Sequence, residues 1–198
     1  TTYAKLAAVD VPATINAIIN KGKLVAHFRQ ITDSQFQVTG GRIVKINELF
    51  YLVGGQKFLG AYNPMGPDHG PGFIQEYTNQ IRKFSLMDDG SRITIDHLPA
   101  ITDEAHLHRR DYNVVPQILP GGQEGATAFS GVFQKTVNIP FLNCVDIDSA
   151  GYTVNHSFTQ YYNHYHCAHF PVYAASTKEM NTVFLGGIAQ YYDDGGLL

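Results

Sequence analysis

The chain has 198 residues, a formal net charge of −3 and no basic run, which argues against an electrostatic surface for nucleic acid. No apolar run approaches the length of about 18 residues that a transmembrane helix needs. Charged residues make up only 16% of the chain, whereas 12 Tyr, 12 Phe and 19 Gly favour a sheet protein with many turns.

Residues 1–22 predict one short helix that leads into the rest of the chain. Asp10 can cap this helix, and Pro12 suits its first turn before three isoleucines at helical spacing. Gly22 then ends the run. We expect the helix to pack over a propeller edge or to lie in a loop between two strands. A strand from Lys23 to Ile31 follows.

A short apolar strand that ends in glycine occurs three times, as FYLVGG at 50–55, TAFSGV at 127–132 and TVFLGG at 182–187. Gly131 and Gly186 lie 55 positions apart, as do two upstream X-Pro pairs, so this alignment equates Ser130 with Leu185. Gly54 precedes Gly131 by 77 positions, and the excess lies in the Pro/Gly-rich segment 61–75. A repeat of about 50 residues with a strand and glycines is typical of a propeller blade.

The repeats predict an all-β fold, a portion of a β-propeller with four-stranded blades. The whole chain, 1–198, is then one propeller portion with about three partial blades. The expected parts are a helix and lead-in at 1–22, a strand of a preceding blade at 23–37, blades at 38–105 and 106–160, and an incomplete blade at 161–198. Closed propellers need about four to eight blades. We expect the remaining blades to come from a longer chain or from another chain.

Four stretches, 38–41, 50–58, 77–84 and 108–113, resemble the kelch-type β-propeller. They also resemble large kelch-like proteins secreted by Bacteroidetes. The Trp that usually follows the third kelch strand is absent here, because the chain has none. The resemblance implies a secreted or cell-surface protein, with export by type IX secretion. It points to a fold rather than to an activity.

Two clusters of charged residues and histidines are the candidates for ligand binding. The 55-residue offset places His164 at the position of Arg109 and His166 at that of Asp111. Both clusters are therefore expected on one face, near the axis of the propeller. There they could bind an anionic or carbohydrate ligand, or the Arg–Asp pairs could pin neighbouring blades. The channel-face candidates are His108, Arg109, Arg110, Asp111, His164 and His166.

No cofactor is predicted, although two metals stay open as alternatives. His164 and His166, at i and i+2 on a strand, would share one side and could bind copper together with His169. The acidic turns 88–90 and 193–195 offer oxygens to calcium, but neither matches an EF-hand loop. The two cysteines, Cys144 and Cys167, are expected to be small buried side chains.

The loop 61–75, with Tyr62, His69 and Phe73, is the candidate partner-binding loop, or else a cover for the propeller edge. The predicted function is a protein-interaction or scaffold module outside the cell. One alternative is a carbohydrate-active enzyme of the sugar-oxidase or mutarotase type. The other is a structural subunit of a surface filament or array. No nucleophile elbow, phosphate-binding loop or HExxH helix is present.

Overall fold

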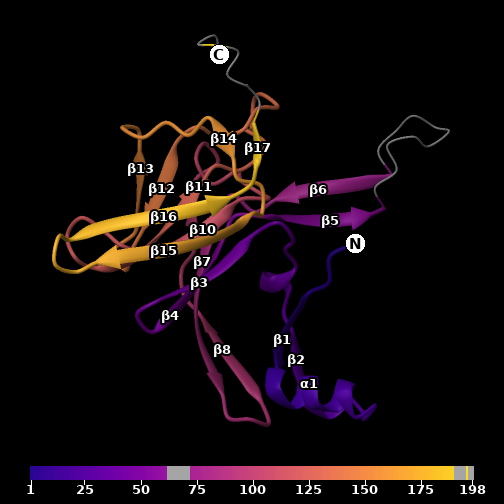
Figure 1. The fold of residues 1–198 in the computed structure, drawn as a ribbon. Coiled ribbons are helices and arrows are strands. Elements are labelled where there is room, and N and C mark those ends of the chain that lie inside the picture. Colours follow the sequence, from indigo (N-terminus) through magenta and orange to yellow (C-terminus); the bar gives the residue numbers. More distant parts are fainter. Residues whose placement is uncertain (62–71, 190–194, 196–198) are drawn as a thin grey trace.

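A computed structural model describes residues 1–61, 72–189 and 195. The protein is mostly β, with 48% strand, 8% helix and several antiparallel sheets, as Figure 1 shows. The predicted all-β class and the one short N-terminal helix are thus confirmed. The sheets do not close into a ring within the described part of the chain.

The first segment is a two-stranded sheet with a helix between its strands. It contains β1 (Lys5–Val9), α1 (Val11–Ile19) and β2 (Phe28–Thr32). Asp10 caps α1 as predicted, because its Oδ1 accepts a hydrogen bond from the Ala13 amide at 3.0 Å. α1 buries none of its residues and lies in the connection between the paired strands β1 and β2. Of the two expected placements, the inter-strand loop is therefore the one observed, and packing over a sheet edge is not.

The strand predicted from Lys23 is shorter than expected. A 3₁₀ turn, η1 (Val25–His27), comes first, and the strand begins only at Phe28. Its partner is β1, which the sequence pattern does not predict. A second 3₁₀ turn, η2 (Ser34–Phe36), then leads into the first large sheet.

Unit 1 is the sheet β3-β4-β7-β8, in which β9 also pairs with β7. Its strands are β3 (Arg42–Ile46), β4 (Leu49–Val53), β7 (Gln80–Asp88), β8 (Ile93–His97) and β9 (Ile101–Thr102). A separate hairpin of β5 (Gln56–Gly60) and β6 (Phe73–Tyr77) lies between β4 and β7 in the chain. β6 ends at Tyr77 and β7 begins at Gln80, and Asn79, with a φ of 55°, lies at the break between them.

Unit 2 is the four-stranded sheet β10-β11-β12-β13. It contains β10 (Asn113–Ile118), β11 (Glu124–Phe129), β12 (Cys144–Ile147) and β13 (Tyr152–Asn155). Unit 3 is the hairpin of β15 (Ala168–Ala174) and β16 (Glu179–Leu185). The short strands β14 (Tyr162–Asn163) and β17 (Ile188–Ala189) pair beside it.

The three units share one backbone design at the ends of their first hairpins. The first cross-strand pairs are Arg42–Val53, Asn113–Phe129 and Ala168–Leu185. A residue in the left-handed region lies two positions before each pair, namely Gly40, Asp111 and His166. Two consecutive left-handed residues follow each pair, namely Gly54–Gly55, Ser130–Gly131 and Gly186–Gly187.

This design corrects the alignment of the repeats by one residue in the second strand. Ser130 is equivalent to Gly186, not to Leu185. The sequence pattern matches glycine with glycine, but unit 2 has a serine at the first left-handed position, with a φ of 62°. Ser130 is fully buried, and its hydroxyl donates a hydrogen bond to Asn163 Oδ1, which helps to hold this unfavourable conformation.

The units stack through their first hairpins, and β10 lies beside both β3 and β15 (Figure 1). One face of the β3–β4 hairpin, with Val44 and Tyr51, packs against Val114 and Ala128 of unit 2 in the main core. The opposite face of unit 2 meets unit 3, where the rings of Phe129 and Phe184 are 5.0 Å apart. The free face of unit 1 is covered by a second cluster around Phe36, Leu52 and Phe84.

Candidate functional site

The structure brings three of the six channel-face candidates together and adds a fourth residue. Arg110 forms an ion pair with Asp111, and His166 Nε2 lies 2.9 Å from Asp111 Oδ1. Arg42 Nη2 lies 3.0 Å from the other ring nitrogen of His166. We call Arg42, Arg110, Asp111 and His166 the charged cluster. Nothing in the sequence pattern singles out Arg42.

The charged cluster lies where the first strands of the three units begin. Gly40, Asp111 and His166 occupy equivalent positions, and the Asp111 amide donates to the Gly40 carbonyl at 2.8 Å. Tyr77 also joins, since Arg110 Nε donates to its hydroxyl at 2.9 Å. The Asp111 side chain is only 13% exposed. Because its carboxylate is already paired, the cluster links the units and leaves this group unavailable to a ligand.

The other three channel-face candidates point elsewhere. Arg109 is 1% exposed, and its guanidinium donates to the carbonyls of Ser130, at 2.6 Å, and Asn143, at 3.0 Å. Burial lowers the pKa of Arg109 to about 10. His108 stacks on Tyr77 at 3.8 Å between ring centroids, and burial lowers its pKa.

The three histidines proposed for copper do not converge. His164 stacks on Phe184 at 4.3 Å, whereas His166 contacts Asp111 and His169 lies near the Cys167 carbonyl. The prediction that His164 and His166 share one side of a strand is wrong, because both lie in the turn after β14. Among the described residues, no group of three His, Cys, Asp or Glu side chains could hold a metal ion.

The acidic turn between β7 and β8 uses its oxygens locally. Asp88 forms an ion pair with Arg29, with nitrogen and oxygen 2.6 Å apart. Asp89 Oδ1 accepts hydrogen bonds from the backbone amides of Arg92 and Ser91, which lower its pKa to about 2. The carboxylates of Asp88 and Asp89 are therefore satisfied by Arg29 and by the backbone of the turn, without calcium. Asp193 and Asp194 lie outside the described residues.

The candidate partner-binding loop is described only at its end. Tyr62 and His69 lie outside the described residues. Phe73 is the first residue of β6, and its ring stacks on Phe58 at 5.1 Å between centroids. Phe73 is predicted to lie in the loop, but it belongs to the β5–β6 hairpin. The two cysteines are free thiols; Cys144 is buried as predicted, whereas Cys167 is half-buried.

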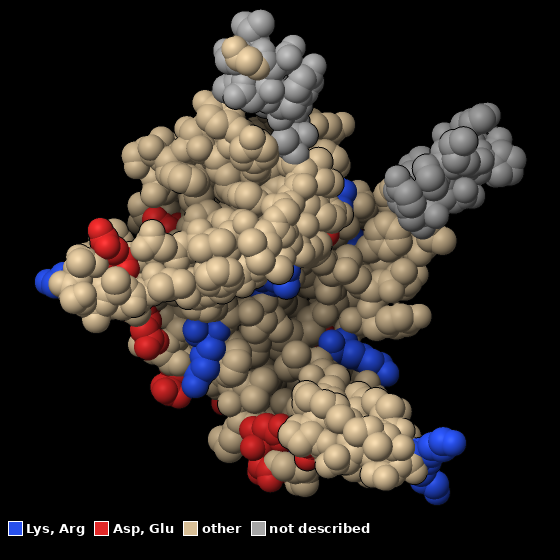
Figure 2. All heavy atoms as spheres, viewed as in Figure 1, with Lys and Arg blue, Asp and Glu red and all other residues tan. Residues whose placement is uncertain are grey.

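A surface that the sequence pattern does not predict lies on unit 3. Cross-strand neighbours share a face, and one face of the β15–β16 hairpin presents Phe170, Val172, Val183 and Leu185, which are 47%, 49%, 37% and 61% exposed. We call these four residues the outer face. In Figure 2, charged side chains gather at the tip of the hairpin, whereas the surface over its middle is uncharged. The alternation of apolar residues in both strands was the available signal.

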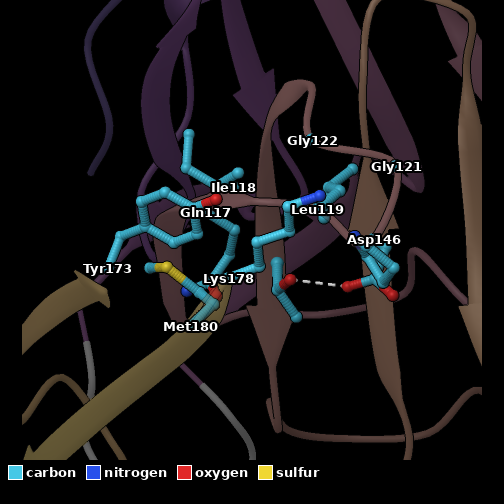
Figure 3. Close-up of a pocket in the computed structure, with 11 residues that line it drawn as sticks. Gln117, Ile118, Leu119, Gly121, Gly122, Asp146, Tyr173, Lys178 and Met180 are labelled. Carbon is cyan, nitrogen blue, oxygen red and sulfur yellow. Dashed lines mark hydrogen bonds between the residues drawn. The ribbon is translucent and has the colours of Figure 1, made fainter. Parts of the chain in front are cut away.

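The opposite face of the same hairpin borders a hollow on unit 2. Figure 3 shows a pocket of about 560 Å³ between Met180 and Tyr173 of unit 3 and Gln117 and Asp146 of unit 2. Thr127 Oγ1 donates to Asp146 Oδ1 at 2.5 Å in this pocket. A second pocket of about 420 Å³ shares Gln117 and Met180 and continues along Thr182 and Phe184. We call the two together the strand groove.

No protein-family model matches the sequence, and no curated protein matches it either. Among the described helices, none is long and apolar enough to cross a membrane. Function must therefore be inferred from the surfaces themselves. The charged cluster is internally paired, whereas the outer face and the strand groove, both formed by described residues of unit 3 and its neighbour, are not.

Proposed function

We propose that this chain is part of a kelch-like propeller that acts outside the cell as a protein-interaction or scaffold module. The observation that carries the proposal is the uncovered outer face of unit 3. The stacking of successive units through their first strands supports the propeller arrangement. In such arrays each unit buries its faces against its neighbours and presents its remaining surfaces to partners.

Equivalent positions in the three units differ sharply in exposure. Val44 of unit 1 is 6% exposed and Val115 of unit 2 is 0% exposed, whereas Phe170 of unit 3 is 47% exposed. The cross-strand partners of these residues follow the same order: Tyr51 is 1% and Thr127 is 5% exposed, but Val183 is 37% exposed. A position that a neighbouring unit buries in units 1 and 2 is thus exposed to solvent in unit 3. Contiguous exposed apolar surface of this kind marks an interaction site.

The test is capture of extracellular proteins by the immobilised chain, with Leu185→Lys in the outer face as the disabling variant. The matched control is Ile74→Lys, which alters a side chain of similar 61% exposure on β6, outside unit 3. We expect a specific protein to bind the wild type and the control and to be lost with Leu185→Lys. Equal capture by all three proteins, or by none, would contradict the proposal.

The interaction role is preferred to a sugar oxidase because His164, His166 and His169 have separate partners, and the described part of the chain holds no group of His, Cys, Asp or Glu suited to a metal ion. A mutarotase would need free cationic groups for an acidic sugar. Arg110 is instead paired with Asp111, and Arg42 Nε donates to the Tyr112 carbonyl at 3.2 Å. A filament subunit would use the same outer face, but its binding partner would be the chain itself. Light scattering of the purified protein separates these two roles.

A further inference from the structure

We propose that the strand groove binds an extended β-strand of a partner protein, which pairs with the free edge of β16. The inference rests on the proposed interaction function and names the kind of partner. It concerns the inward face and the edge of unit 3, not the outer face. The two surfaces can therefore be tested separately.

The free edge is evident from the equivalent strands. In unit 1, Phe50–Val53 of β4 pair with β7, and in unit 2, Ala126–Ala128 of β11 pair with β12. The equivalent residues of β16 are Thr182–Leu185. Within the described residues β16 pairs with β15 alone. An open edge of this kind is a template for an added strand, which would gain main-chain hydrogen bonds.

The groove beside that edge has the shape that a strand requires. Alternate residues of β16, Met180, Thr182 and Phe184, line its wall, and Phe129, Thr127 and Asp146 of unit 2 line the other side. This is the surface against which a third strand would lie if unit 3 resembled unit 2. A strand added about 4.8 Å from β16 would point every second side chain into the groove.

The side chains of the occupant follow from the strands already in place. Phe84 lies opposite Phe50 in unit 1, and Ile147 lies opposite Ala126 in unit 2. The residue opposite Thr182 should therefore be bulky and apolar, and it should point into the groove. Lys178 lines the far end, without an ion pair to any described carboxylate. In an antiparallel strand, an acidic residue four positions after the apolar one would reach it.

The chain's own β7 sequence satisfies this pattern and supplies the probe. A synthetic peptide of residues 80–88, QIRKFSLMD, has the apolar Phe84 and, four positions later, Asp88. The experiment measures hydrogen exchange of the full chain with and without this peptide. We expect exchange of those amides of 179–185 that point away from β15 to slow about tenfold or more, while exchange in β4, which already has two neighbours, stays unchanged.

Three variants locate the binding. Met180→Asp places a carboxylate in the groove and should weaken peptide binding about tenfold or more. Val172→Lys, on the outer face, should leave peptide binding unchanged. Lys178→Glu should weaken binding of the peptide, and a peptide with Asp88→Lys should restore it. Restoration by this charge exchange would fix the register and the direction of the strand.

Several results would overturn the inference. One is unchanged exchange across 179–185 at about 1 mM peptide. Another is slow exchange, before any peptide is added, at the amides of 179–185 that point away from β15, which would mean that the protein's own chain fills the groove. A third is loss of peptide binding in Val172→Lys but not in Met180→Asp. Partner capture is scored with Leu185→Lys and peptide binding with Met180→Asp, so a failure of this inference is distinguishable from a failure of the proposed function.

Discussion

Arg109 shows how a charged side chain can be structural in this protein. Its guanidinium lies 4.0 Å from the centroid of the Phe141 ring and donates to the carbonyls of His106, Ser130 and Asn143. These carbonyls belong to loops before β10, after β11 and before β12. One side chain therefore satisfies buried acceptors from three segments that the sheets leave unpaired.

We expect Arg109→Lys to destabilise the fold by about 3 kcal/mol, because a single ammonium cannot reach all of these acceptors and some stay buried without a partner. Urea unfolding followed by circular dichroism measures the change. Arg92→Lys, in the exposed β7–β8 turn, is the control and should alter stability by less than about 0.5 kcal/mol. A similar loss in both variants would contradict the structural role.

Asp103 makes stability depend on pH in the acid range. Burial alone would raise its pKa, but hydrogen bonds from Tyr152, at 2.7 Å, and His106 lower the pKa to about 2. The unfolded chain has the ordinary value of about 3.9 and so binds more protons between these two values. Its contribution is complete above that unfolded value and is lost as the pH falls towards about 2.

Asp103→Asn should therefore lower stability at neutral pH and flatten the acid dependence. The measurement is urea unfolding of both proteins at several pH values from about 7 down to 2. The gap between the wild type and the variant should narrow as the pH falls below about 4. A gap that is constant over the whole range would show that the ionisation of Asp103 does not matter.

At the scale of the elements, the paired left-handed residues that end each first hairpin are the strongest constraint. At Gly55, with a φ of 81°, an added Cβ would lie 2.5 Å from Val38 Cγ1 and 2.6 Å from the Gly41 nitrogen. At Gly90, with a φ of 87°, an added Cβ would meet nothing within 4 Å. The two glycines thus have similar backbone conformations but different surroundings.

We expect Gly90→Ala to cost about 1 kcal/mol, from the left-handed conformation alone. Gly55→Ala should cost about 4 kcal/mol, because the clash adds to the same backbone cost. Thermal unfolding of the two variants gives the comparison. Equal losses would mean that the close approach of Gly55 to Gly41 is not maintained in solution.

The sequence predicts the hairpins and the repeat because glycine and apolar alternation are local signals. It misplaces Ser130 by one position, since the backbone there requires a left-handed residue, not a glycine as such. The β1–β2 pairing is missed because it joins strands on either side of α1, and no local pattern encodes such a partner. Three of the four residues of the charged cluster are predicted, and Arg42 is missed because it reaches His166 only when units 1 and 3 both stack on unit 2.

At the scale of the whole molecule, the stacking order decides where a charge is tolerated. Val115 and Phe170 occupy equivalent positions, but only Val115 is covered by a following unit. We expect Val115→Lys to prevent stable folding, because a lysine would be buried without a partner. Phe170→Lys should change stability by less than about 1 kcal/mol. Soluble yield and urea unfolding measure both.

A large loss of stability in Phe170→Lys would contradict this account, since it would mean that the outer face is covered within the protein itself. The apolar residues of α1, near the other end of the chain, are likewise not covered by a neighbouring unit. Ile18 and Ile19 are 60% and 71% exposed, so charges there should also be tolerated.

In each unit, the backbone just after the second strand of the first hairpin pairs with the backbone that precedes the first strand of that hairpin. Backbone bridges join Thr39 to Gln56 and Arg110 to Val132, and β14–β17 pairing joins Asn163 to Ile188. The segments that follow these bridges differ in length, yet in units 1 and 2 each segment leads back to the sheet as its third strand, β7 or β12. The segment between the bridge and the third strand is thus a suitable site for inserting foreign sequence, because the pairing of the sheet does not depend on its length.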